Sequence, residues 1–130
     1  MKSNNKLILT ERIEQRILFI RGKKVILDRD LATLYGVETK QLKRAVKRNM
    51  SRFPEDFMFT LSRQEHRDLR CQIGTLNKRT HSKYLPYAFT EHGILMLSSV
   101  LNSERAIDIN IHIMRVFTRL REVMARHKDL

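Results

Sequence analysis

The sequence predicts an α+β fold in which a helix-turn-helix core is joined to a short β-hairpin or small sheet and to a long C-terminal helix. Three observations predict it. Two apolar runs flank a turn with a glycine at position 22, a second glycine at position 36 separates two short helical patterns, and residues 104–126 carry apolar side chains at helical spacing. A chain of 130 residues suffices for one domain with its own core. We expect a flexible N-terminus at 1–6 and a single domain at 7–130, with its core in 17–117.

The first elements follow from a cap and two apolar runs. Thr10 is suited to cap a short helix over 11–16. Ile17–Ile20 and Val25–Leu27 read as strands, because each is a short apolar run bounded by polar residues. Residues 21–24 form a tight connection between them, so we expect a β-hairpin.

The two helices of the helix-turn-helix core are bounded by turn-forming residues. Asp28 is expected to cap the first helix, and Gly36 to end it, since a residue without a Cβ adopts the left-handed conformation at little cost. Thr39 is expected to cap the second helix, which extends to Phe53. Pro54 stops this helix by disfavouring the α conformation in the residue before it.

A strand and a capped helix are expected next. Residues 57–61 alternate in the manner of a strand. Ser62, followed three residues later by Glu65, forms a capping box for a helix that extends to Cys71. The polar segment 74–83 is expected to be a loop of unassigned function.

The last part of the domain begins with an aromatic strand and an apolar helix. Tyr84–Phe89 is expected to lie at a sheet edge, because Pro86 lacks the N–H that a central strand needs. Thr90 is suited to cap the helix Gly93–Leu101, and Asn102 to break it.

The long C-terminal helix is predicted from residues 104–126. Residues 107–113 alternate strictly and would also fit a strand, but one helix gathers the polar residues of the whole segment into a single stripe. The stripe consists of Asp108, His112, Arg115, Arg119, Glu122 and Arg126. The remaining apolar arc is wider than one contact face requires. Either the helix is sunk deep in its own core, or it is shared with a partner chain, such as a second copy in a homodimer, or with a downstream domain.

The second helix of the core carries the strongest functional pattern. On a helical wheel its apolar residues fall on one side and its cations on the other, and no acidic residue lies between Thr39 and Arg52. Asn49 falls on the apolar side and is expected to bond to the backbone. Ala32 and Gly36 allow the two helices to approach and bend, with Val37 and Leu42 filling the angle between them.

Such a helix is suited to a DNA groove lined by phosphates. Its N-terminal part would meet base edges, while cations farther along would hold phosphates. The expected base-reading residues are Thr39, Lys40, Gln41, Lys43 and Arg44. The expected phosphate-binding residues are Lys47, Arg48 and Arg52.

Composition supports this interpretation and argues against others. The net charge of +12 favours a polyanionic partner such as double-stranded DNA. A single cysteine excludes an internal disulfide, and neither a signal peptide nor a membrane-spanning stretch is expected, so we expect a cytoplasmic protein. The histidines do not fall into metal-binding spacing and no Gly-rich phosphate loop occurs, so we expect no cofactor, no metal and no enzymatic activity.

Several blocks of the sequence also resemble a known family. The blocks are IRGKKVILDRDLATLYGVETKQLKRAVKRN, RFPEDFMF, YLPYAFTEHG, LSSVLNSERAI and IMRVF. They resemble the phage ORF-six N-terminal domain family, which is grouped with the KilA-N and Bro-N DNA-binding domains, over about Ile17 to Phe117. Lys43 stands where the family pattern has Asn, and His92 where it has Gln. The resemblance implies a phage or prophage DNA-binding regulator. The alternative is an antirepressor-like module that acts on a host or phage regulator protein.

Overall fold

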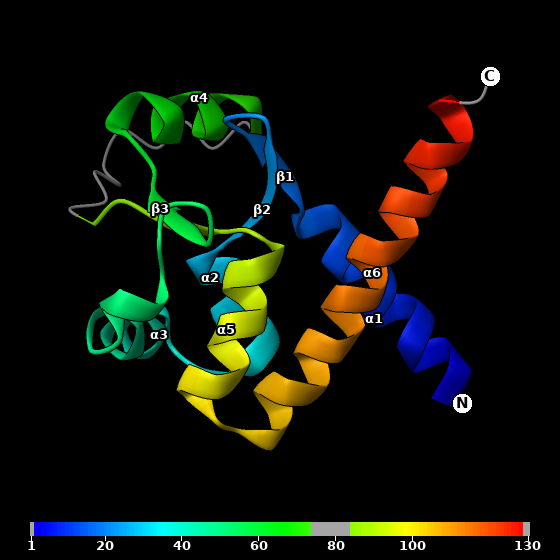
Figure 1. Ribbon diagram of the computed structural model, residues 1–130, viewed down its shortest axis with the longest axis horizontal. Helices are drawn as coiled ribbons and strands as arrows, with labels where there is room; N and C mark the ends of the chain where they lie inside the picture. The colour runs from blue at the N-terminus through cyan, green and yellow to red at the C-terminus, as the bar shows by residue number, and fades with distance from the viewer. Residues whose placement is uncertain (1, 74–83, 129–130) are drawn as a thin grey trace.

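The computed structural model describes residues 2–73 and 84–128, and it has the predicted α+β architecture (Figure 1). Strands β1, β2, β4 and β3 pair in that order into an antiparallel sheet. In chain order the elements are α1 (Lys2–Arg16), β1 (Leu18–Ile20), β2 (Lys23–Leu27), α2 (Asp28–Tyr35), α3 (Thr39–Lys47), a 3-10 turn (Met50–Arg52), β3 (Met58–Thr60), α4 (Arg63–Ile73), β4 (Tyr87–Phe89), α5 (Glu91–Leu101) and α6 (Glu104–Lys128). None of the helices in the described ranges has a stretch apolar enough to cross a bilayer. The segment 74–83, predicted to be a loop, lies outside the described residues.

The predicted β-hairpin is confirmed. Strand β1 pairs with β2 so that Leu18 lies opposite Val25. The turn residues Arg21 and Gly22 both have positive φ, 55° and 74°. Two consecutive residues with positive φ match the twist of the flanking strands, which explains why this two-residue turn closes the hairpin.

Strand β4 lies in the middle of the sheet, so the prediction of an edge strand is wrong. Its Phe89 is opposite Ile26 of β2, and its Ala88 is opposite Phe59 of β3. Pro86 precedes the strand, where its missing N–H interrupts no strand pairing, and its carbonyl accepts a hydrogen bond from the backbone N–H of Leu61 at 2.9 Å.

The sheet is covered on both faces by different helices. Ile26, Met58 and Phe89 belong to the larger core, which also contains buried side chains of α1, α2, α3, α5 and α6. Neighbouring positions such as Val25 and Ala88 face a smaller core that is completed by Leu69 of α4. Successive strand residues therefore contribute to opposite layers, as the pleat of a strand requires.

Helices α5 and α6 were both predicted, and they lie side by side as an antiparallel pair (Figure 1). The hydroxyl of Thr90 accepts the N–H of Gly93 at 3.4 Å and caps α5. Asn102 ends α5 in the left-handed conformation, with φ of 45°. The buried Asn110 of α6 accepts the hydroxyl of Tyr35 at 2.5 Å and donates to the Ile94 carbonyl at 3.1 Å, which joins α6 to α2 and α5.

The first helix begins earlier than predicted. It starts at Lys2 rather than Glu11, so residues 2–6, expected to be flexible, are helical and Thr10 lies within α1 instead of capping it. The cause is tertiary: Ile13 is fully buried and Leu9 packs against the same core, next to α6. Once a turn is held by packing, each further helical residue adds a hydrogen bond at small cost.

The capping box of α4 is confirmed and has a third member that the sequence did not indicate. Glu65 accepts the backbone N–H of Ser62 at 2.8 Å, and the Ser62 hydroxyl accepts the N–H of Glu65 at 3.1 Å. Arg21, at the tip of the hairpin, donates to both carboxylate oxygens of Glu65 at 2.8 and 2.9 Å. The hairpin turn and α4 are thus tied together by one carboxylate.

This carboxylate makes stability depend on pH. The hydrogen bonds from Arg21 and then from Ser62 lower the pKa of Glu65 from 4.5 to about 2. Because the folded-state pKa is depressed, the stabilisation is present above about pH 4.5 and is lost as the pH falls towards 2. We expect Glu65→Gln to lower the free energy of unfolding at pH 7 by about 1 kcal/mol, since the pair is partly solvated. In urea denaturation, its difference from wild type should shrink at pH 2.5, whereas the control Gln72→Ala, which removes no titratable group from the same helix, should show no such trend. An equal difference at both pH values would contradict this.

Candidate nucleic-acid interface

Helices α2 and α3 are joined by the predicted tight turn. Gly36 ends α2 in the left-handed conformation, with φ of 73°, and Val37 donates its N–H to the Ala32 carbonyl at 3.0 Å. A Cβ at Gly36 would also lie 3.1 Å from the guanidinium carbon of Arg105, so glycine is favoured by space as well as by φ. Leu42 is fully buried as predicted, but Val37 is 39% exposed and does not fill the angle between the helices.

Helix α3 is shorter than predicted and is capped differently. Glu38 is its N-cap residue and makes no side-chain cap hydrogen bond, so Thr39 is the first helical residue rather than the cap. The helix ends at Lys47, not Phe53. The side-chain amide of Asn49 donates to the Ala45 carbonyl at 2.8 Å, which confirms its predicted backbone role. A 3-10 turn follows, because the chain must bend here to bury Phe53 against Phe89.

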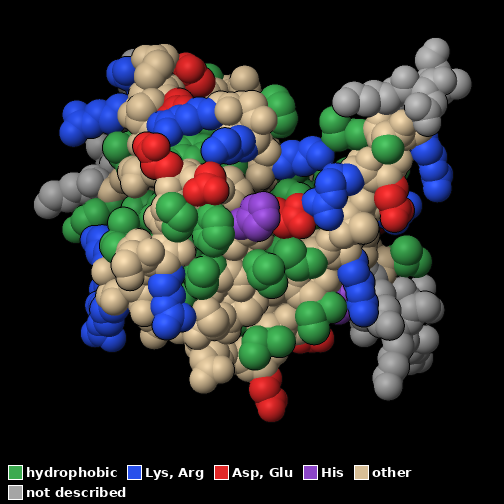
Figure 2. All heavy atoms as spheres, viewed as in Figure 1, with side chains coloured by type: hydrophobic (Ala, Val, Ile, Leu, Met, Phe, Trp, Pro, Cys, Tyr) green, Lys and Arg blue, Asp and Glu red, His purple; other side chains and the backbone are tan. Residues whose placement is uncertain are grey.

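The predicted separation of apolar and basic faces on α3 is confirmed. Leu42 and Val46 are fully buried, and Thr39 is half-buried at the start of the helix. Helix α3 lies at the edge of the molecule opposite the projecting end of α6 (Figure 1), and Figure 2 shows Lys and Arg side chains gathered at this edge. The exposed residues of this face, called the α3 basic face below, are Lys40, Gln41, Arg44, Lys47 and Arg48.

Arg52 does not continue this face. It lies in the 3-10 turn, and its guanidinium donates to the hydroxyl of Ser99 on α5 at 3.4 Å. The predicted phosphate-binding residues are therefore divided between the end of α3, which holds Lys47 and Arg48, and the turn beyond it.

Lys43 is placed differently from the other predicted base-reading residues. Its ammonium lies 3.4 Å from a carboxylate oxygen of Asp28 and donates to the Leu85 carbonyl at 2.9 Å. It also lies 4.9 Å from the centre of the Tyr87 ring, and the side chain is only 15% exposed. Lys43 thus ties α3 to β4 and to the residues that precede it.

Asp28 is the other half of this tie, and its predicted role as a helix cap is wrong. The N-cap position is taken by Leu27, and Asp28 is the first residue of α2, 2% exposed. One carboxylate oxygen accepts the N–H of Arg29 at 2.7 Å, and the other accepts the N–H of Tyr87 at 3.0 Å and faces Lys43. Sequence reasoning missed this junction because its members lie up to 59 residues apart.

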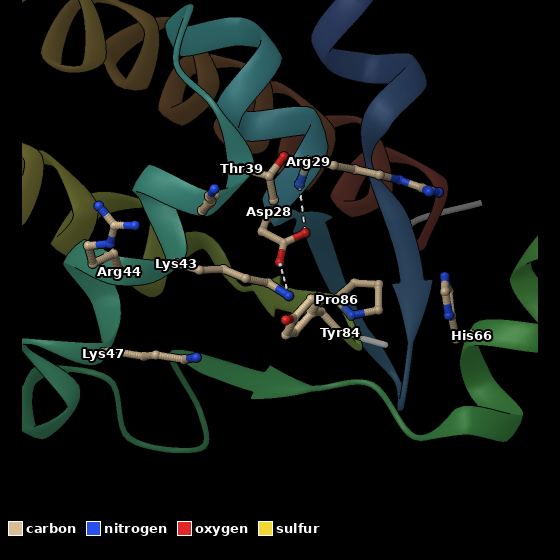
Figure 3. Close-up of a pocket in the computed structure, with 10 residues that line it drawn as sticks. Asp28, Arg29, Thr39, Lys43, Arg44, Lys47, His66, Tyr84 and Pro86 are labelled. Atoms are coloured by element: carbon tan, nitrogen blue, oxygen red, sulfur yellow. Dashed lines mark hydrogen bonds and ion pairs between the residues drawn. The ribbon is translucent and has the colours of Figure 1, made fainter. Parts of the chain in front are cut away.

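A cavity of about 650 Å³ adjoins this junction (Figure 3). Lys43 and Lys47 extend from α3 on one side, His66 of α4 stands on the other, and Tyr84 and Pro86 lie between them. Burial is the main cause that lowers the pKa of His66, so its imidazole is neutral at pH 7. The lining residues are Asp28, Arg29, Thr39, Lys40, Lys43, Arg44, Lys47, His66, Tyr84 and Pro86.

Residues 15–100 match the family model of the ORF6N domain. No curated protein and no solved structure matches the chain in the corresponding comparisons. Within residues 2–73 and 84–128, no three His, Cys, Asp or Glu side chains gather as they would around a metal ion. The arrangement is therefore best interpreted from its charges and its shape.

The Lys43–Asp28 contact leads to a prediction about stability. Lys43→Met keeps an apolar chain over Tyr87 but leaves the buried Asp28 carboxylate without its cation, so we expect the free energy of unfolding to fall by about 3 kcal/mol. Lys47→Met, one turn along the same helix and exposed, is the matched control and should change it by less than about 0.5 kcal/mol. Urea denaturation measures both, and equal losses in the two variants would refute a structural role for Lys43.

Proposed function

Because this chain belongs to the ORF6N domain family, a phage-type domain, we propose that it binds double-stranded DNA through the α3 basic face. One observation carries the proposal. The exposed cations of α3 form a continuous surface, while the opposite side of the helix is anchored by the fully buried Leu42 and Val46. A helix anchored in this way can enter the major groove as the second helix of a helix-turn-helix unit. The role is then regulatory and is exercised in the cytoplasm, where the DNA is accessible.

In the proposed interface, the residues of α3 have different roles along the helix. Thr39, Lys40, Gln41 and Arg44 are close to the N-terminal end, the part of such a helix that reads base edges. Lys47 and Arg48 follow, at the end suited to phosphates. Lys43 contributes indirectly, because its contact with Asp28 fixes the orientation of the helix that carries the other cations.

A binding protein without enzymatic activity agrees with how the carboxylates of α2 are used. Asp28 is occupied by two backbone N–H groups and Lys43, and Asp30 accepts a hydrogen bond from Arg16 at 3.1 Å. Carboxylates held in this way are poorly placed to bind the metal ion that a nuclease would need.

The decisive variant removes the exposed cations and spares Lys43. Lys40→Ala, Arg44→Ala and Lys47→Ala together should weaken binding to a duplex by about a hundredfold at 0.1 M salt. The slope of log affinity against log salt should become shallower by about 1, because Lys47 is the one member of the three that is assigned to a phosphate and each phosphate contact contributes about 0.9. Fluorescence anisotropy with a labelled duplex measures both quantities.

The matched control is Arg12→Ala, Arg115→Ala and Arg126→Ala, which removes the same charge from exposed positions of α1 and α6. Its affinity should stay within about threefold of wild type, since α1 and the projecting part of α6 lie on the side of the molecule away from α3 (Figure 1). If both triple variants lose affinity equally, binding follows net charge and α3 is not the interface.

Exposed apolar side chains favour a second candidate, a protein-interaction module. Ile107 and Ile111 of α6 are 41% and 46% exposed. A groove of about 460 Å³ between β1 and the C-terminal half of α6 is lined by Phe19, Leu120 and Val123, among others. Large exposed apolar side chains on a projecting helix are typical of protein contacts. The occupant we propose for this groove is a second copy of the chain. The alternative is a host or phage regulator protein on which the chain acts as an antirepressor-like module.

A homodimer formed at this groove makes a direct prediction about size. Light scattering should give twice the 15.5 kDa of the monomer for the wild type and the monomer mass for Phe19→Ser/Val123→Glu, because a buried charge prevents apolar docking. Leu95→Glu, at an exposed apolar position on α5, is the control and should remain dimeric. A monomeric wild type would reject the dimer and leave the groove to a different protein.

A further inference from the structure

The α3 basic face is hollowed next to Lys43 and Lys47, and the hollow is large enough for a small ligand. Its volume of about 650 Å³ falls in the range of roughly 300 to 1,000 Å³ that is usual for small-ligand sites. A DNA duplex is far too wide to enter it and would meet only its rim. The cavity therefore offers a second mode of recognition that duplex binding does not use.

The charge of the cavity selects an anion. Its cationic lining residues are supplied by α2 and α3. Among the described lining residues the only carboxylate is that of Asp28, which already faces Lys43 and two backbone N–H groups. Lys47 points into the space and is exposed (Figure 3), so its ammonium is available to a phosphate. The cationic lining residues are Arg29, Lys40, Lys43, Arg44 and Lys47.

Besides its positive charge, the cavity has a flat apolar surface, which Tyr84 provides. Its side chain lies at the cavity and the residue is 69% exposed, unlike Tyr35, which is 3% exposed in the core. The Lys43 ammonium lies 5.9 Å from the centre of the Tyr84 ring, and Pro86 lies beside it. An exposed aromatic ring beside cations is the combination that single-stranded nucleic-acid sites use, since every base can stack on an aromatic ring.

We propose that this cavity binds one unpaired nucleotide, with the base stacked on Tyr84 and the phosphate held by Lys47. The shared chemistry is a nucleobase joined to a phosphate. It can come from a free mononucleotide or from a residue at the end, or in an unpaired part, of a DNA strand. This inference deepens the proposed function. It rests on that function only because both use a cation of the α3 basic face.

The test follows tyrosine fluorescence, because the chain has no tryptophan and three tyrosines. Titration with thymidine 5′-monophosphate and with a twelve-residue oligothymidylate should quench the emission as a base stacks on Tyr84. Tyr84→Leu should weaken oligothymidylate binding about tenfold, measured by anisotropy of a labelled strand, whereas Tyr84→Phe should retain it. Duplex affinity should change less than about twofold in either variant, since Tyr84 lies outside the α3 basic face.

The outcomes separate this proposal from duplex binding. If the mononucleotide binds in a Tyr84-dependent way, a free nucleotide is a sufficient ligand. If only the oligonucleotide does so, the ligand is an unpaired residue of a DNA strand. Tyr84-dependent binding of either ligand by a protein that fails to bind duplex DNA would reject the proposed function and leave this inference standing. If Tyr84→Leu binds both ligands as tightly as wild type, or loses single-strand and duplex affinity in equal proportion, the cavity is not a nucleotide site.

Discussion

The buried carboxylate of Asp28 is the constraint on which the arrangement of the basic surface depends. It lies where α2 begins, accepts the N–H of Tyr87 at the start of β4, and faces Lys43 of α3 at 3.4 Å. A carboxylate that is 2% exposed is tolerated only when its hydrogen bonds and a counter-charge are supplied. Those partners come from the backbone of β4 and from α3, so meeting this requirement sets α3 against the sheet.

This junction explains why the cations of α3 are not equivalent. Lys43 is held inside the protein by its contact with Asp28, whereas Lys40, Arg44 and Lys47 remain exposed. The helix therefore has three kinds of position: apolar residues that anchor it, one lysine that orients it, and cations that a ligand can reach. When the helix that bears long, flexible side chains is already fixed, less conformational entropy is lost on binding, and this favours affinity.

Local signals in the sequence predicted much of the fold, and long-range contacts account for most of what they missed. The hairpin turn at Gly22, the capping box of Ser62 and Glu65, and the end of α2 at Gly36 depend on neighbouring residues, so their patterns were sufficient. The central position of β4 could not be predicted, since it depends on pairing with two distant strands. At the candidate site, the exposed cations follow from helical spacing. The burial of Lys43 depends on Asp28, fifteen positions earlier, which no periodicity indicates.

The cavity and the exposed cations also bear on each other physically. Lys47 lines the cavity and belongs to the α3 basic face, so the same charge would serve an unpaired nucleotide and a phosphate of a duplex. When the phosphate of a bound nucleotide neutralises Lys47, this lysine can no longer displace counterions from a duplex. Two ligands that share charges in this way must weaken each other's binding by the same factor, because coupling between sites is reciprocal. An unpaired nucleotide would then act as a competitor of duplex binding without requiring any change in the fold.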